Sequence, residues 1–257
     1  MPMQTSADRR QFFERYRGSI AYVEVERSSG TISIGTAFHV GDGVFVTARH
    51  VVEGNSVVRM STTEDAYVPS GSVAGVRDRG IRGGEEFDVV RPRSLTVRSG
   101  PHLHPDPRVD VAVIATNGLS EGVPAIQLGG HLDDWIARSD FVLSEAIVLG
   151  YPPIPLDKEP RLVALRTEVI AQVDPYDRPH VHFVLGAMPR GGLSGGLAWS
   201  EWGFALGLIT DSLVRDNNAV ELGYLCVVTV EPIYDCLEAH ELLPASQTEW
   251  LREHPSS

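Results

Sequence analysis

The feature that most constrains the fold of this chain is a series of short apolar runs, each of strand length and each ended by Gly, Pro, Asn or Asp. The series starts with "SIAYVEVE" just after Gly18 and ends with "LGYLCVVTV", and runs such as "DVAVIAT" and "HVHFVLGA" lie between them. Many short strands with frequent turn signals are typical of antiparallel barrels and sandwiches, whereas α/β folds alternate strands with helices. The sequence therefore predicts an all-β protein.

Two helices are predicted outside this series. A short helix over Ala7–Tyr16 follows Ser6, whose side-chain oxygen can cap the first exposed N–H groups. A second helix runs from about Glu231 to about Leu243, because three apolar residues fall on one face: Ile233, Leu237 and Leu242. Residues 61–105 carry scattered Arg, Gly and Pro, so long loops with one or two edge strands are expected there.

Composition excludes several classes of function. Acidic residues outnumber basic ones by 34 to 22, giving a net charge of −12, which argues against a nucleic-acid partner and against anionic membranes. The N-terminus lacks a signal-like apolar core and no stretch is long and apolar enough to span a bilayer, so a cytoplasmic protein without membrane attachment is expected. Cys226 and Cys236 make no disulfide framework and are expected to be buried thiols.

One loop combines a hydroxyl with unusual backbone freedom. In "MPRGGLSGGLAW", Ser194 lies between two pairs of glycines. Glycine adopts backbone angles closed to other residues and lets another molecule approach the main chain. Ser194 is therefore either a nucleophile whose neighbouring N–H groups bind an oxyanion, or part of an ordinary tight turn between strands.

A nucleophilic serine needs a base, and the base needs an acceptor that fixes its tautomer. His50, in "GVFVTARHVV", stands at the end of an apolar strand, where packing on both sides can direct it into a cleft. Asp110, in "PRVDVAVIAT", starts another apolar strand, and a carboxylate that is buried there needs a dedicated partner. Each context alone is weak, and the three together favour a catalytic constellation.

Together, "TARH", "DVAVI" and "GLSGG" resemble the three signature stretches of the trypsin-like (chymotrypsin-fold) serine peptidases, in the order His, Asp, Ser. "VLGYP" and "ALGLITDS" are similar to strands of that family's second barrel, and "LGYLCVVTVEPIYDCLE" is similar to the last strand and closing helix of bacterial Deg-type members. The resemblance covers roughly residues 18–243. It implies two packed antiparallel six-stranded β-barrels, at 18–125 and 126–257, after a helical segment at 1–17.

The resemblance also implies an activity, that of a serine endopeptidase acting on a protein or peptide substrate without a cofactor or metal. Ser194 would attack the scissile carbonyl, His50 would take and return its proton, and Asp110 would hold the imidazole. The backbone N–H groups of Gly192 and Ser194 would form the oxyanion hole, and Thr210 would donate a hydrogen bond to Asp110.

Specificity is expected from the residues around this site. The resemblance implies that Met188, six residues before the serine, lies at the base of the pocket, with Thr210, Ser212 and Gly223 on its walls. These residues favour a small or medium apolar side chain before the cleaved bond. Asp211 would contradict this preference if its carboxylate pointed inward.

Leu193 departs from the family pattern, because many members have an aspartate or asparagine immediately before the serine. A leucine cannot bind a freed N-terminus, so activation of the digestive-zymogen type is not expected, and packing is one way in which the loop could be held. About a dozen residues follow the last predicted helix, so no PDZ-like domain is expected. A regulatory partner is possible but unidentified.

The same sequence features allow three alternatives to a serine endopeptidase. "GGLSGG" contains the Gly-x-Ser-x-Gly pattern of α/β-hydrolases, but the 63 residues after Ser194 lack that fold's alternating pattern. A catalytically impaired binding module on the protease fold remains the main rival, because of Leu193. Two His-x-His pairs, His102 with His104 and His180 with His182, could each supply two metal ligands, although surface or strand histidines without metal are the favoured interpretation.

Overall fold

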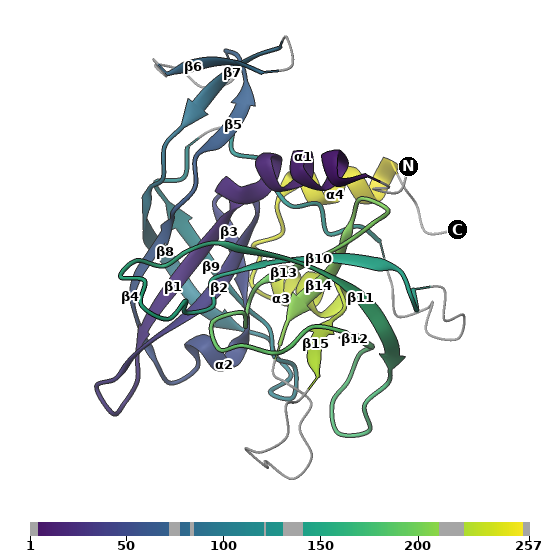
Figure 1. Ribbon diagram of the computed structural model, residues 1–257. Helices are drawn as coiled ribbons and strands as arrows, with labels where there is room; N and C mark the ends of the chain where they lie inside the picture. The colour runs from purple at the N-terminus through teal and green to yellow at the C-terminus, as the bar shows by residue number, and fades with distance from the viewer. Residues whose placement is uncertain are drawn as a thin grey trace.

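A computed structural model gives the structure of the chain. It describes residues 5–71, 78–82, 85–120, 122–130, 141–210 and 224–253. Figure 1 shows two barrels beside each other, the first in purple to teal and the second in green to yellow.

The first barrel is closed by six antiparallel strands in the order β1-β2-β3-β9-β8-β4. Their bounds are β1 Ile20–Glu26, β2 Ile32–Gly41, β3 Val44–Thr47, β4 Ser56–Thr62, β8 Ser94–Leu103 and β9 Ala112–Asn117. The apolar runs at these positions form strands because their side chains face a shared interior, and β3 is buried along its whole length.

The second barrel is also closed by six antiparallel strands, in the order β10-β11-β12-β15-β14-β13. Their bounds are β10 Glu145–Gly150, β11 Val163–Val173, β12 His182–Leu185, β13 Leu197–Ser200, β14 Ala205–Ile209 and β15 Leu225–Val228. The fold class expected from the sequence, two packed six-stranded β-barrels, is confirmed.

The region between β4 and β8 is more ordered than the prediction of long loops with one or two edge strands. It contains a separate three-stranded sheet in the order β5-β7-β6, with bounds β5 Ala66–Pro69, β6 Arg79–Arg82 and β7 Glu85–Val90. In Figure 1 this sheet projects from the top of the molecule. It has a small apolar cluster of its own, formed by Ala66, Val68, Val90 and Val123. A sheet of three strands was not expected there, because the strands are short and Arg, Gly and Pro are scattered among and between them.

The helices also differ from expectation in detail. Helix α1 spans Ser6–Tyr16, but its N-cap is Thr5, whose side chain and Asp8 form a capping box. The helix predicted at 231–243 is shorter in the structure, where α3 spans Glu231–Ala239, and a further helix that was not predicted, α4, follows at Ala245–Glu253. Pro244 separates them, and a proline disfavours the helical conformation in the residue before it. The remaining short elements are the 3₁₀ turn η1 at Arg17–Ser19 and α2 at Arg49–Val52.

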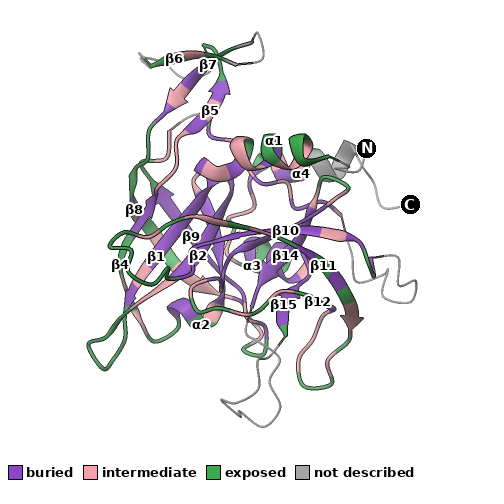
Figure 2. Cartoon of the chain, in the orientation of Figure 1, coloured by how far each residue is buried: buried purple, intermediate pink, exposed green. Residues whose placement is uncertain are grey.

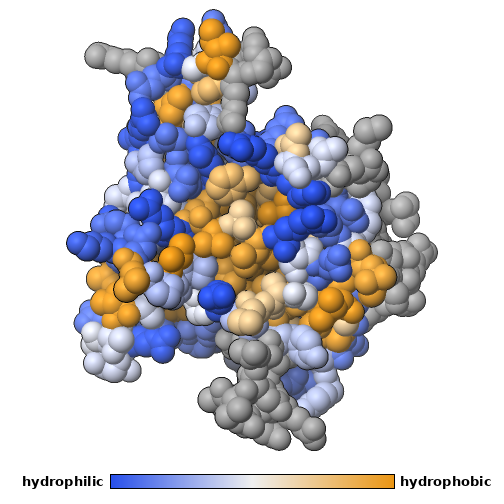
Figure 3. All heavy atoms as spheres, in the orientation of Figure 1, coloured by the Kyte–Doolittle hydropathy of each residue, from blue (hydrophilic) through white to orange (hydrophobic). Residues whose placement is uncertain are grey.

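One apolar core joins the two barrels. Figure 2 shows many buried residues in the strands of both barrels, although β8 and β11 are mostly intermediate or exposed. One cluster of buried residues extends through both barrels and includes side chains of α1 and α3. Figure 3 shows apolar side chains gathered in the middle of one face, at the junction of the barrels, with hydrophilic residues around them. Cys226 and Cys236 are both buried and unbridged, as predicted, and burial raises the pKa of the Cys236 thiol to about 12.

The helices near the two ends of the chain each pack on the barrel that is more distant from them in sequence. Phe12 of α1 stacks on Trp199 of the second barrel, with ring centroids 4.9 Å apart. Gln247 of α4 returns to the first barrel, where its amide nitrogen donates to the carbonyl of Val40 at 2.7 Å. Each barrel is therefore clamped by a helix from the opposite end of the chain. Among the helices described, none has both the length and the apolar character needed to cross a bilayer.

Candidate active site

His50 and Asp110 form a doubly hydrogen-bonded pair. His50 lies in α2, directly after β3, and Asp110 lies two residues before β9, the strand paired with β3. Nδ1 of His50 is 2.8 Å from Oδ2 of Asp110, and the backbone N–H of His50 donates to Oδ1 at 2.9 Å. One carboxylate therefore fixes both the position of the helical turn and the orientation of the imidazole.

Ser194 stands at the tip of a glycine-rich turn between β12 and β13. The N–H of Leu193 donates to the carbonyl of Arg190 at 3.2 Å, which closes a turn with Gly192 at φ +84°. A positive φ at the third residue of a turn is the type II geometry, and glycine adopts it without strain. Gly195 follows at φ +86°, so the serine is flanked on both sides by left-handed backbone.

Thr36 of the first barrel holds this turn. Its N–H donates to the carbonyl of Ser194 at 2.9 Å, and its Oγ1 donates to the carbonyl of Gly192 at 2.6 Å. The same Oγ1 accepts the N–H of Tyr151, at 2.9 Å, so one hydroxyl joins β2, the end of β10 and the serine turn. A Cβ at Gly195 would lie against the carbonyl oxygen of Thr36. The serine turn is therefore fitted directly against the first barrel.

The turn leaves two backbone donors unused. The N–H groups of Gly192 and Ser194 donate to no acceptor within the part of the chain that the structure describes. In contrast, the N–H groups of Gly195 and Gly196 donate to the carbonyls of Ile209 and Leu193, at 2.8 Å in both cases. These two unpaired N–H groups, one on the serine itself and one two residues before it, can stabilise negative charge on an oxygen bound beside them.

Leu193 anchors the turn by packing. Its side chain is fully buried and belongs to the core that joins the two barrels. Gly150 at the end of β10 lies under it, so close that a Cβ there would be 3.1 Å from Leu193 Cδ2. The residue before the serine is therefore held by an apolar contact, which needs no aspartate or asparagine at that position.

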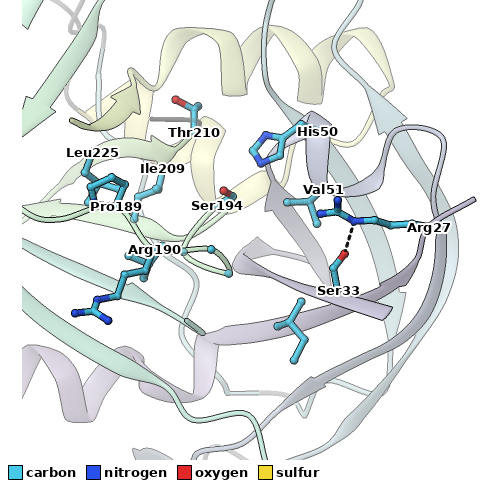
Figure 4. A pocket seen from close by; sticks show the side chains of 14 residues that line it. Arg27, Ser33, His50, Val51, Pro189, Arg190, Ser194, Ile209, Thr210 and Leu225 are labelled. Carbon is cyan, nitrogen blue, oxygen red and sulfur yellow. Dashed lines mark hydrogen bonds between the residues drawn. The ribbon is translucent and has the colours of Figure 1, made fainter. Parts of the chain in front are cut away.

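A cleft of about 320 Å³ opens in front of His50 and Ser194, which both line it. Figure 4 shows the two side chains projecting into it from opposite barrels. Pro189, Ile209 and Leu225 form an apolar wall on the Ser194 side. Arg27 lines the other side, where its Nε donates to Ser33 Oγ at 3.1 Å.

Two predicted site residues lie differently from expectation. Thr210 lines the cleft, but its Oγ1 is buried without a hydrogen-bond partner among the described residues, and Figure 4 shows it directed away from His50. The predicted bond to Asp110 is not formed, and both carboxylate oxygens of Asp110 already accept from His50. Met188 is 53% exposed and does not line the cleft; the next residue, Pro189, does.

The remaining predicted pocket residues, Asp211, Ser212 and Gly223, lie outside the described residues. Sequence reasoning missed Thr36 because a threonine in a buried strand carries no signal of a partner 156 residues away. It also missed Pro189, Ile209 and Leu225 as an apolar wall, although Ile209 and Leu225 stand at strand ends close to predicted pocket residues.

Several solved protease structures share the fold of this chain. The inactive form of the Rv3671c protease from M. tuberculosis aligns with a TM-score of 0.56 and 18% identity, over 93% of this chain and 97% of that chain. The HtrA-type protease AlgW with a tripeptide gives 0.54 and 15%, over 91% and 62%. The serine endoprotease from Yersinia pestis gives 0.54 and 16%, over 91% and 66%.

At these identities the structural likeness shows the fold. Comparison with curated protein sequences gives no match. The trypsin-like peptidase domain family, however, matches residues 35–208, more than half of the chain, in a span that holds His50, Asp110 and Ser194. The chain therefore belongs to the trypsin-like peptidase domain family, and its enzyme class is that of the serine endopeptidases.

Proposed function

We propose that the protein hydrolyses peptide bonds through an acyl-enzyme intermediate, with Ser194 as nucleophile, His50 as general base and then acid, and Asp110 as the residue that positions His50. The observation that carries this proposal is the doubly bonded His50–Asp110 pair in the same cleft as Ser194. A neutral imidazole whose Nδ1–H is held by a carboxylate presents Nε2 as the acceptor for a serine proton.

The reaction begins when Ser194 Oγ bonds to the scissile carbonyl carbon and its proton passes to His50 Nε2. The resulting oxyanion accepts from the N–H groups of Gly192 and Ser194, which have no acceptor among the described residues. The imidazolium then protonates the leaving amine, and the C–N bond breaks. Water repeats the sequence on the acyl ester and releases the acid, with Ser194 regaining its proton from His50.

The substrate is a protein or peptide with a small or medium apolar side chain before the cleaved bond. Pro189, Ile209 and Leu225 support this preference because they give the cleft an apolar wall next to Ser194. Binding of such a side chain removes apolar surface from water and brings the carbonyl group of the same residue, which is the scissile one, to the serine.

The test is digestion of a proteome-derived peptide mixture by the wild type and by Ser194→Ala, with products read by mass spectrometry. We expect new termini after apolar residues in the wild type, and a loss of about 10⁴-fold or more in Ser194→Ala. Unchanged cleavage by the variant contradicts the nucleophile, and cleavage after charged residues contradicts only the proposed preference.

The pH profile tests the base independently. Activity falls as the pH drops through the range in which a histidine gains its proton, near 6–7, because an imidazolium cannot accept the serine proton. A rate that stays flat through that range contradicts a histidine base. If the fold served only as a binding module, the wild type would bind peptides from the same mixture without producing new termini.

A further inference from the structure

The structure brings together one histidine from each His-x-His pair. His104 lies in the segment between β8 and β9, His180 lies just before β12, and Asp235 lies on α3. Their candidate ligand atoms, one per residue, all lie within 4.8 Å of one another. The three residues come from the first barrel, the second barrel and the closing helix.

The most deeply placed member of this cluster has an unused nitrogen. His104 is 7% exposed, and its buried Nε2 has no hydrogen-bond partner among the described residues. Its other ring nitrogen faces the backbone of Asp106, 3.0 Å from the amide nitrogen and 3.3 Å from the carbonyl oxygen. A buried polar atom without a partner is costly, so a ligand for Nε2 is expected. The N–H of Asp106 donates to Nδ1 in the structure, so a metal on Nε2 requires the other tautomer, in which Nδ1–H donates to the carbonyl of Asp106 as in many metal-bound histidines.

His180 is held in place by strained backbone. Its φ is +70°, a left-handed value that is uncommon for a side chain other than glycine. The buried His182 steadies this conformation, with its Nδ1 3.1 Å from the carbonyl oxygen of His180. One histidine of each pair, His104 and His180, therefore belongs to this cluster. His102 instead packs against His240, with ring centroids 4.9 Å apart.

We propose that His104, His180 and Asp235 form a zinc site that ties the two barrels and α3 together. Two imidazole nitrogens and one carboxylate oxygen are a donor set that zinc takes readily, with a fourth position left for water. Ligand atoms around tetrahedral zinc lie about 3.3 Å apart, so ligand atoms that lie within 4.8 Å of one another need to approach by up to about 1.5 Å. Asp235 is exposed and His180 is half-buried, so the side chains of these two residues are the ones that shift toward the more deeply buried His104.

The site is linked to the catalytic cleft through the backbone of His104. The N–H of His104 donates to the carbonyl of Val111 at 3.0 Å, and its carbonyl accepts from Arg49 Nη1 at 3.0 Å. Val111 follows Asp110 and Arg49 precedes His50. A zinc ion on His104 therefore stabilises the segment that carries the His50–Asp110 pair.

The test is calorimetric titration of chelator-treated full-length protein with Zn²⁺, together with the thermal midpoint at saturating Zn²⁺. The wild type is expected to bind one ion per chain and to melt several degrees higher with zinc, because the ion binds the folded state. Mg²⁺, which prefers oxygen ligands, is expected to give neither effect. No Zn²⁺ binding by the wild type overturns the proposal.

Variants locate the ion. His104→Gln and Asp235→Asn are expected to weaken Zn²⁺ binding at least tenfold, whereas His102→Gln and the same-helix charge control Glu238→Gln are expected to leave it unchanged. Asp235 is exposed, so its variant tests the site even if His104→Gln folds poorly. Zinc affinity that is unaffected in Asp235→Asn but lost in His50→Ala would place the ion at the catalytic pair and overturn the proposal.

Discussion

The first barrel holds its two candidate catalytic residues with bonds of its own, whereas the second barrel holds its serine turn with bonds that cross between the barrels. His50 and Asp110 are joined by two hydrogen bonds within the first barrel, at 2.8 and 2.9 Å. The carbonyls of Gly192 and Ser194, by contrast, accept from Thr36 of the first barrel. The base is thus organised locally, and the nucleophile is organised by the docking of one barrel on the other.

The largest expected effect on activity comes from disrupting the His50–Asp110 pair. Asp110→Asn is expected to lower kcat by about 10⁴-fold, because an amide in place of the carboxylate no longer selects the tautomer with the proton on Nδ1. The thermal midpoint is expected to stay close to that of the wild type. Steady-state kinetics and a melting curve on one preparation give both values, and a kcat within tenfold of the wild type would contradict the role of Asp110.

The next effect comes from the turn itself. Gly195→Ala places a Cβ at φ +86° against Thr36 and 2.5 Å from Thr47 Oγ1, so the turn has to move and the N–H of Ser194 moves with it. Loss of one oxyanion donor lowers kcat by about 10²–10³-fold.

The matched control for that change is Gly203→Ala. Gly203 also has a positive φ, +95°, but a Cβ there meets nothing within 4 Å. It carries the same kind of backbone strain without the collision. Equal losses of activity in the two variants would show that strain alone, and not contact with the first barrel, explains the effect.

A pH effect on stability is expected from a buried histidine of the first barrel. Burial lowers the pKa of His39 in β2 to about 4, from an ordinary value of 6.5. Between those two values the unfolded chain binds a proton that the folded chain does not, so the free energy of unfolding falls as the pH falls. The loss is about 3 kcal/mol by pH 4. Urea unfolding at several pH values measures it, and His39→Gln should flatten the slope; an unchanged slope would exclude His39 as its source.

The smallest effect tests the bonds across the barrels. Thr36→Val removes the hydroxyl that donates to the carbonyl of Gly192, and a bond of about 1 kcal/mol corresponds to a loss of up to about tenfold in kcat. Thr116→Val is the control, since Thr116 Oγ1 makes a similar bond, at 2.9 Å to the carbonyl of Gly43, in the same barrel. We expect both variants to lose stability, Thr36→Val more because its Oγ1 also accepts the N–H of Tyr151, and we expect a loss of kcat in Thr36→Val alone.

Much of the fold was predictable because short apolar runs and turn residues specify strands locally. The barrels and the helix α1 follow from such patterns, and three short motifs around His50, Asp110 and Ser194 indicated the family. The sheet β5-β7-β6 was not predictable, because its strands bury only a few side chains in a small cluster of their own.

The details of the site depended on contacts that no local pattern contains. The role of Thr36 arises from the docking of two barrels, and the anchoring of Leu193 arises from the core between them. The bond from Thr210 to Asp110 was expected from family resemblance alone, and in the structure the Thr210 hydroxyl is buried without a partner among the described residues. The meeting of His104 with His180 likewise joins residues that are distant in sequence.

The most direct measurement is labelling of the intact protein with a fluorophosphonate that reacts with activated serines, with the adduct located by mass spectrometry. We expect one adduct, on Ser194, and we expect its rate of formation to fall steeply in His50→Ala and modestly in Thr36→Val. Absence of an adduct on Ser194, or an equal rate of labelling in His50→Ala, would contradict the claim that the two barrels together activate this serine.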